Sequence, residues 1–202
     1  MEATPPVADT RGAAATDAGE RILDAAYGLF CTRGVNIVGI DEIIATSGVA
    51  RQTLYRRFRS KRDLVLAVLE RREQLWSRGW LQAEVERRAV DPEARLLAVF
   101  DVFDGWFRRD DFEGCAFINV MLEHPDADDP IREACVVYLA RIREFLASLA
   151  AEAGIADPND FARRWHILMK GSIISAGEGD VDAAQRAQRI GALILEREPR
   201  AL

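Results

Sequence analysis

The spacing of apolar and polar residues along this chain of 202 residues predicts helices and no strands. Apolar residues recur every three or four positions, as on one face of a helix, and no stretch alternates apolar and polar residues as a half-buried strand does. We therefore expect an all-α fold of about nine helices. They are expected near residues 18–33, 40–46, 51–58, 61–88 (with a bend near Gly79), 92–109, 116–123, 130–153, 158–176 and 181–198.

Capping residues mark where several of these helices begin. An Asp-Pro pair suits a helix start, because Asp can cap the helix and Pro needs no N–H donor at the first helical position. Such pairs occur at residues 91–92, 129–130 and 157–158. Asp17 with Glu20, and Ser60 with Asp63, have the spacing of a capping box. We expect five residues to cap the helices that follow them: Asp17, Ser60, Asp91, Asp129 and Asp157.

The stretch from Ile40 to Lys61 has the pattern of two short helices joined by a tight turn. Gly48 lies in the turn, where glycine can adopt a left-handed backbone conformation. The apolar residues are spaced to meet in one small core: Ile40, Ile43, Ile44, Val49, Leu54 and Phe58. Together with the preceding helix, the pattern predicts a helix-turn-helix domain over residues 17–62.

The second short helix has a basic and polar outer face. From Gly48 to Arg62 there are six basic residues and no acidic one. Arg and Gln can make paired hydrogen bonds to base edges, hydroxyl groups suit phosphates, and a lysine beside a helix N-terminus suits a phosphate. The residues predicted to contact DNA are Arg51, Gln52, Thr53, Tyr55, Arg56, Arg57 and Lys61. A solvated basic helix surface is the alternative.

These residues also carry a family resemblance. The run GVARQTLYRRFRSKRDLVLAV resembles the end of the DNA-binding domain of the TetR family, whose usual form is close to GVSxGTLYxHFxSKExLxxAV. The similarity covers about residues 21–68. It implies an effector-binding and dimerisation domain over residues 63–202, and a homodimer that binds a palindromic operator on double-stranded DNA. Ala50, Gln52 and Arg57 depart from the usual Ser, Gly and His, so we expect a different operator to be read.

The resemblance further implies a repressor that a small-molecule effector releases from DNA. A pocket lined by aromatic and methionine side chains would suit an apolar or amphipathic effector. The first candidates to line it are Trp106, Phe117, Met121, Tyr138 and Trp165. For each of them, an ordinary place in the core is the alternative.

Two stripes on the last two helices are candidates for the dimer interface that the resemblance implies. One consists of Ala183, Ala187, Ile190, Gly191 and Ile194; the other consists of Phe161, Trp165, Leu168, Ser172 and Ile173. Small residues let helices approach closely. Internal packing within a monomer is the alternative.

The charge distribution supports DNA binding, although the net charge of −6 does not. Residues 17–78 contain eleven basic and eight acidic residues, whereas residues 79–202 contain fifteen basic and twenty-three acidic ones. DNA is therefore expected at one end of the molecule.

Residues 1–16 are rich in Ala, Thr, Pro and Asp and are expected to form a disordered tail. The chain has three cysteines without close pairing and no secretory segment, and it has no apolar run of the roughly 18 residues needed to span a membrane. We therefore predict a cytoplasmic protein without a membrane partner.

The motifs of common enzyme classes are missing from the sequence. It contains no nucleophile elbow, phosphate loop or dinucleotide fingerprint. Residues 124–129 lack the pattern of a calcium loop, and the histidines and cysteines show no zinc spacing. We predict no enzyme, no catalytic residue, no cofactor and no metal; Cys115 and Cys135 stay open as a redox pair. Two other classes stay open: a helical ligand-binding protein or enzyme without specific DNA binding, and an adaptor for an acidic partner.

Overall fold

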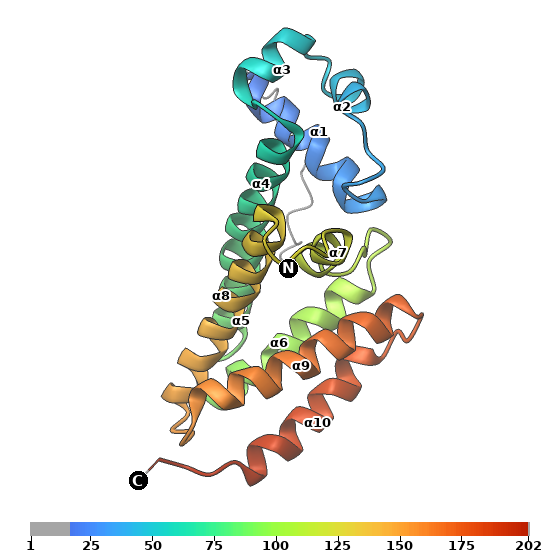
Figure 1. Ribbon diagram of the computed structural model, residues 1–202. Coiled ribbons are helices and arrows are strands. Elements are labelled where there is room, and N and C mark those ends of the chain that lie inside the picture. Colours follow the sequence, from blue (N-terminus) through green and yellow to red (C-terminus); the bar gives the residue numbers. More distant parts are fainter. Residues whose placement is uncertain (1–16, 202) are drawn as a thin grey trace. The chain divides into compact units, whose positions relative to one another are not determined.

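The structure, a computed structural model, describes residues 17–201, which are almost entirely helical. The helices are α1 (Ala18–Arg33), α2 (Ile40–Ser47), α3 (Arg51–Arg57), α4 (Lys61–Arg72), a π-helical segment (Glu73–Gln82), α5 (Ala83–Arg88), α6 (Pro92–Phe107), α7 (Ala116–Glu123), α8 (Pro130–Glu152), α9 (Pro158–Gly177) and α10 (Ala183–Arg197) (Figure 1). The described range has no strand beyond an isolated bridge between Ile155 and Arg200. The all-α prediction is confirmed. The predicted disordered tail lies outside the described residues.

The long fourth helix of the prediction consists of α4, the π-helical segment and α5, which follow one another without a break. Counted as one, they bring the helices of residues 17–201 to the expected nine. Gly79, where a bend was expected, lies within the π-helical segment. A π-helix has a wider turn than an α-helix, so side chains after it are rotated relative to those before it.

Contacts divide the described chain into two compact units. We call residues 17–75 and 116–137 the head, and residues 76–115 and 138–201 the body. The predicted functional boundary at residue 62 stays a prediction.

The core of the head forms around α1, which contacts α2, α3 and α4, while α4 also contacts α7 (Figure 1). Within the predicted small core, Ile43, Val49 and Leu54 are buried. The other three members are partly exposed: Ile40, Ile44 and Phe58. Ile22, Ala26 and Phe30 of α1 complete the buried layer. The amphipathic pattern of the first three helices thus forms one core.

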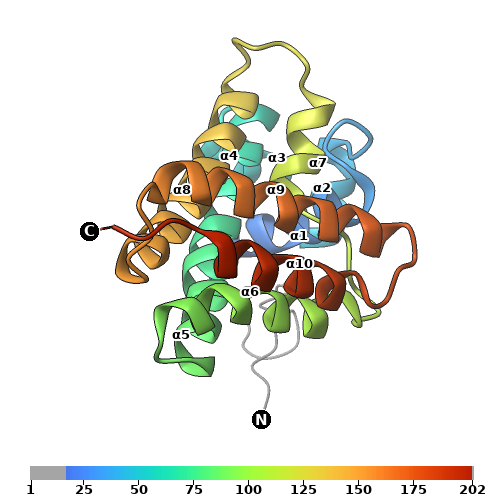
Figure 2. The ribbon, with the colours of Figure 1, turned by 90° about the horizontal axis from the view of Figure 1, so that it is seen from below.

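In the body, α6, α9 and α10 lie side by side, and α10 contacts both of the others (Figures 1 and 2). Gly191 of α10 lies against the Trp165 ring of α9; a Cβ at Gly191 would be 2.7 Å from Trp165 Cη2. Trp165 also stacks on Phe161, with ring centroids 5.1 Å apart. A glycine is therefore required where α10 crosses the indole ring.

Most residues of the two stripes predicted for the dimer interface face inward, so the prediction was wrong for these residues. Seven of the ten residues are buried: Phe161, Trp165, Ser172, Ile173, Ala183, Ala187 and Gly191. They pack α9 and α10 within one chain, which was the alternative interpretation. Periodicity shows that a helix has an apolar face, but the same pattern serves an internal and an external partner.

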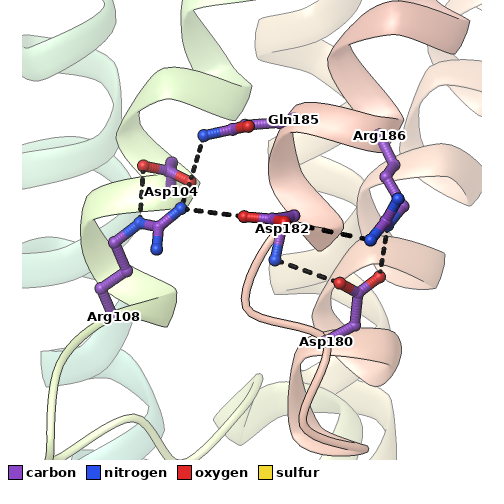
Figure 3. Close-up of polar contacts among 6 residues, drawn as sticks. All are labelled: Asp104, Arg108, Asp180, Asp182, Gln185 and Arg186. Carbon is purple, nitrogen blue, oxygen red and sulfur yellow. Dashed lines mark hydrogen bonds and ion pairs between the residues drawn. The ribbon is translucent and has the colours of Figure 1, made fainter.

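A polar network joins the end of α6 to the start of α10 (Figure 3). Arg108 Nη2 lies 2.9 Å from Asp104 Oδ1 and 3.3 Å from Asp182 Oδ1, while Gln185 Nε2 donates to Asp104 Oδ1 at 3.4 Å. Asp104, then Asp182, raises the pKa of the Arg108 guanidinium. Asp182 precedes α10 without capping it through its side chain, and its carboxylate instead pairs with Arg108.

The caps that the Asp-Pro pairs predict are present. Asp91 Oδ2 accepts the N–H of Ala94 at 2.9 Å, and Asp157 Oδ1 accepts that of Asp160 at 3.0 Å. Asp129 Oδ1 accepts the N–H of Ile131 at 2.8 Å. All three pairs therefore begin helices as expected.

The predicted capping box at Asp17 was wrong, although α1 begins at Ala18 as expected. The Asp17 side chain makes no capping hydrogen bond, and its Oδ1 lies 2.5 Å from Arg57 Nη2. Glu20 likewise pairs with Arg71 at 2.6 Å. A guanidinium group competes for the carboxylate, because it brings a full positive charge where a backbone N–H brings only a dipole. Within residues 17–201 we find no helix with the length and apolarity that crossing a membrane requires.

Candidate nucleic-acid interface

The turn between α2 and α3 depends on Gly48. Its backbone is left-handed, with φ of 63° and ψ of 24°, and its N–H donates to Ile44 O at 3.0 Å. This geometry ends α2 and reverses the chain toward α3. Ala50 then occupies the N-cap of α3 in an extended conformation, without a side chain that could cap. The helix begins, but one first-turn N–H lacks the hydroxyl partner that serine would give.

Helix α3 places most of the predicted DNA contacts on the surface of the head. Leu54 is buried and anchors the helix, while Thr53 is partly exposed. The exposed members are Arg51, Gln52, Tyr55, Arg56 and Arg57. Their arrangement gives a basic and amide-bearing surface of one short helix. Contact between these side chains and DNA stays a prediction.

Two of these arginines already face an acid. Arg51 pairs with Asp41 of α2, and Arg57 pairs with Asp17 at 2.5 Å. Both pairs are solvent-exposed, so each contributes about 0.2–1 kcal/mol and can exchange its carboxylate for a phosphate. Spacing within α3 could not separate these two from Arg56, because Asp41 lies on α2 and Asp17 lies just before α1.

Gln52, Tyr55 and Arg56 differ from the two paired arginines. Across residues 17–201, no hydrogen bond or ion pair engages their side chains. Gln52 and Arg56 are four residues apart, hence neighbours on the same face of α3. An amide and a guanidinium group one turn apart can reach successive base edges in a major groove.

Lys61 is the first residue of α4 and is partly exposed. Ser60 Oγ accepts the N–H of Asp63 at 3.1 Å, which confirms that Ser60 caps α4. The first N–H groups of a helix have no partner within it, and its dipole favours an anion. A phosphate at this end of α4 could contact both the backbone and the Lys61 ammonium group.

Glu123, at the end of α7, fixes the loop between α1 and α2. Its Oε1 accepts the N–H of Val35 at 3.1 Å, and its Oε2 accepts the N–H of Asn36 at 2.7 Å. Asn36 Nδ2 donates back to Glu123 O at 3.1 Å. At Gly34, where φ is 86°, a Cβ would lie 3.0 Å from Glu123 Oε1. This contact could not be predicted from the sequence, because no local pattern links residues 87 or 88 positions apart.

The five predicted effector residues fall in both units. Phe117 is buried on α7 of the head, and Met121 is partly exposed there. In the body, Trp106 packs edge-on against Trp76, with ring centroids 4.8 Å apart. Trp165 is fully buried, and its Nε1 lacks a hydrogen-bond partner among the described residues. Tyr138 is partly exposed, with the Arg141 guanidinium carbon 5.2 Å from its ring centroid. A role in effector binding stays a prediction for all five.

A small cavity in the head was not predicted. It has a volume of about 20 Å³ and a mostly apolar lining from α1, α4 and α7, including Tyr27, Phe30, Val68 and Val120. Ligand pockets typically enclose about 300–1,000 Å³. In this conformation the cavity therefore has room for little more than water, and none of the five predicted effector residues lines it.

The fold and the site define the class of protein: a helix-turn-helix regulator with a small DNA-binding head. Comparison with known proteins gives the family. Residues 22–68 match the family described as bacterial regulatory proteins, tetR family, and residues 92–191 match the tetracyclin repressor-like C-terminal domain. The chain belongs to the tetR family.

Among curated relatives, the transcriptional regulator AcuR of Cereibacter sphaeroides is 28% identical over 152 residues, which cover 71% of this chain and 69% of that protein. The transcriptional activator FasR of Mycolicibacterium smegmatis is 37% identical over 90 residues. That match covers 45% of this chain and only 40% of FasR, so it extends over less than half of that relative.

Solved structures have the same fold. The TetR-family regulator SCO4454 of Streptomyces coelicolor superposes with a TM-score of 0.79 at 27% identity, over 89% of this chain and 94% of that one. Reduced NemR of E. coli has a TM-score of 0.78 over 87% of this chain and 95% of its own. Its 21% identity supports a shared fold alone.

Proposed function

We propose that this DNA-binding transcriptional regulator is a homodimeric repressor, released from a palindromic operator by a small-molecule effector. The observation that carries the proposal is the exposed face of α3, where Gln52 and Arg56 lie one turn apart without side-chain partners in the described chain. A forked contact from either to a base edge would discriminate against the wrong base by about 1–3 kcal/mol.

The paired arginines and Lys61 take the second role, that of positioning the head on DNA. Phosphate contacts fix orientation and carry no direct base information. Arg51 and Arg57 would leave Asp41 and Asp17 for phosphates, and Lys61 would hold a phosphate at the start of α4. Each such contact steepens the slope of log affinity against log salt concentration by about one.

The dimer interface that we propose is the outer face of α9 and α10. Large apolar side chains are exposed there: Ile167, Ile174, Ile190 and Leu193. Gly171, between the first two, has open space around its Cα, so a second helix can approach closely. Ile174→Glu would place a charge in this seam. We expect it to yield monomers in light scattering, whereas a dimer of unchanged stability would reject this face.

Effector release follows from linkage. Two recognition helices fit DNA at one spacing, about one helical turn apart. A ligand that binds the body more tightly at another spacing lowers DNA affinity by the same coupling free energy. A ligand that is indifferent to spacing could not act as an inducer. The protein would act in the cytoplasm, where it meets bacterial DNA, and we assign it no catalytic role.

Variants of the two kinds of contact test the proposal. On a selected operator, Arg56→Ala or Gln52→Ala should lower affinity about 5- to 150-fold, with a much smaller effect on random DNA, because base readout is lost. Lys61→Met should weaken both DNAs alike and reduce the salt slope by about one. Equal losses on operator and random DNA for Arg56→Ala would reject base readout and favour the basic head as an adaptor surface.

A further inference from the structure

A buried histidine in the body lies within electrostatic range of two basic side chains. His166 of α9 is only 3% exposed, and its Nδ1 is buried without a hydrogen-bond partner in residues 17–201. Lys170 follows one turn later on α9, on the same face. Arg143 of α8 lies close enough to act electrostatically on both. The cluster thus combines three nitrogen-bearing groups from two helices.

These groups oppose one another's positive charge. Burial, then Lys170 and Arg143, lowers the pKa of His166 to about 3, so its ring is neutral at pH 7. Burial and Arg143 lower the pKa of Lys170, while Cys115 acts in the opposite direction. Burial and Arg163 lower the pKa of Arg143, and the nearby Glu144 carboxylate offsets them only in part.

The cluster lacks the acids that accompany other arginines of the body. Arg164 pairs with Asp160 at 2.7 Å and with Glu198 at 2.6 Å, and Arg108 pairs with Asp104 and Asp182. Across the described residues, no ion pair involves Arg143, Arg163 or Lys170. Residues 79–202 carry eight more acidic than basic groups, so this absence is not due to a shortage of carboxylates. Basic groups without acidic partners are suited to bind a carboxylate or another anion.

We propose that Arg143, His166 and Lys170 bind the carboxylate of a small organic acid, and that this acid is the effector. The effector role of this acid rests on the proposed function, whereas the binding site itself does not. A guanidinium fork and an ammonium group match the two oxygens of a carboxylate. His166 contributes its buried Nδ1. In the neutral tautomer that carries its proton on Nδ1, this nitrogen donates a hydrogen bond to the same carboxylate. Ala162 and Met169, buried on either side of His166 along α9, are apolar and suit the remainder of the acid.

The two histidines of the chain provide a direct test in the full-length protein. Ring signals of isotope-labelled histidine separate His166 in the body from His124 in the head, and His166→Gln assigns them. The probes are acetate, benzoate and octanoate, each beside its neutral amide, and inorganic phosphate. We expect at least one carboxylate, but not its amide, to shift the His166 signal and to leave that of His124 unchanged.

Charge-removing variants show whether the cluster itself binds. Lys170→Met and Arg143→Met should each weaken carboxylate binding about 10- to 100-fold, the usual effect of losing one charge-assisted hydrogen bond. Arg197→Met, which removes an exposed charge of α10, is the matched control and should bind as the wild type does. Circular dichroism and the His166 signal of the ligand-free variants verify that they fold.

Several outcomes would overturn the site: no carboxylate moves the His166 signal, phosphate alone moves it, or Lys170→Met binds as tightly as the wild type. In the ligand-free protein, Lys170→Met should also raise the pKa of His166, and an unchanged value would refute the cluster. Operator affinity is measured separately with the bound carboxylate present. If the acid binds at His166 and operator affinity stays constant, the site stands and the effector role in the proposed function fails.

Discussion

Two groups of basic side chains, on α3 of the head and on α8 and α9 of the body, differ in how water reaches them. Arg56 on α3 is exposed, so solvent screens its charge and the lack of an acid beside it has little energetic consequence. Lys170 is partly buried on the same helix as the buried His166, and there its charge and that of Arg143 repel more strongly than in water. An exposed lone arginine therefore indicates function only through the fold that carries it, whereas the body cluster is distinguished by a buried histidine nitrogen without a partner in the described residues.

The largest effect should come from acid titration of the body. The pKa of His166 is lowered to about 3 in the folded protein, against about 6.5 when unfolded. The unfolded state therefore binds more protons between these values, and stability falls as pH falls through this window. From pH 7.5 to 4.5 the loss due to His166 should be about 2–3 kcal/mol.

Urea unfolding at the two pH values measures that loss in the wild type and in His166→Gln. The variant should lose less stability on acidification, because glutamine does not titrate, and its other groups are the same. Parallel losses in the two proteins would mean that His166 is hydrated and that the contrast between body and head is weaker than the structure indicates.

In the head, Glu123→Gln should reduce the free energy of unfolding by about 1–3 kcal/mol, because an amide cannot accept both the Val35 and the Asn36 N–H groups through oxygen. Exposed Glu196→Gln of α10 removes the same charge and is the control. Amide hydrogen exchange at Val35 and Asn36 locates the effect. Unchanged protection at these two amides in the variant would refute the proposed clamp on the loop.

A smaller gain is expected from Ala50→Ser. The serine hydroxyl can accept a first-turn N–H of α3, which should stabilise the head by about 1 kcal/mol. Thermal unfolding measures the gain. Ala45→Ser, in the interior of α2 and equally exposed, adds the same hydroxyl where no first-turn N–H is available, so it should not stabilise. A gain of similar size in both variants would exclude capping as its cause.

The smallest effect should come from releasing a paired arginine. Asp17→Asn frees Arg57 and removes one negative charge near the DNA-binding surface, so DNA affinity should rise by no more than about fivefold, equivalent to about 1 kcal/mol. Asp160→Asn breaks an exposed pair in the body and should leave DNA affinity unchanged. A fall in affinity for Asp17→Asn would show that Asp17 holds Arg57 in its DNA-binding position, so that the pair is not exchangeable.

Local signals in the sequence were sufficient for the helices and for the turn. The Asp-Pro pairs, Ser60 and Gly48 act within a few residues, and each begins or ends a helix as predicted. The wrong predictions involve partners that are distant in the chain. Asp17 was expected to cap α1, but Arg57 takes its carboxylate from forty positions away. The stripe around Gly191 was assigned to a second subunit, but Trp165 of the same chain covers it.

The candidate DNA-binding site, too, could be predicted only as far as local signals reach. Spacing alone identified the residues on the outer surface of α3, because exposure follows from helical periodicity around the buried Leu54. It could not separate Arg51 and Arg57 from Arg56, since the acids Asp41 and Asp17 lie on or beside other helices. Nor could it relate Arg143 to His166, because the electrostatic effect of Arg143 on His166 depends on how the chain folds in space.

The most direct test of a dimeric sequence reader is selection of random duplex DNA by the purified full-length protein, followed by salt titration of the selected duplexes. A dimeric sequence reader should select a palindrome with half-sites about one helical turn apart and bind it about 10³-fold or more tightly than random DNA at physiological salt. Selected duplexes without a common motif, bound only weakly and with steep salt dependence, would contradict it. The exposed face of α3 would then be a generic basic surface.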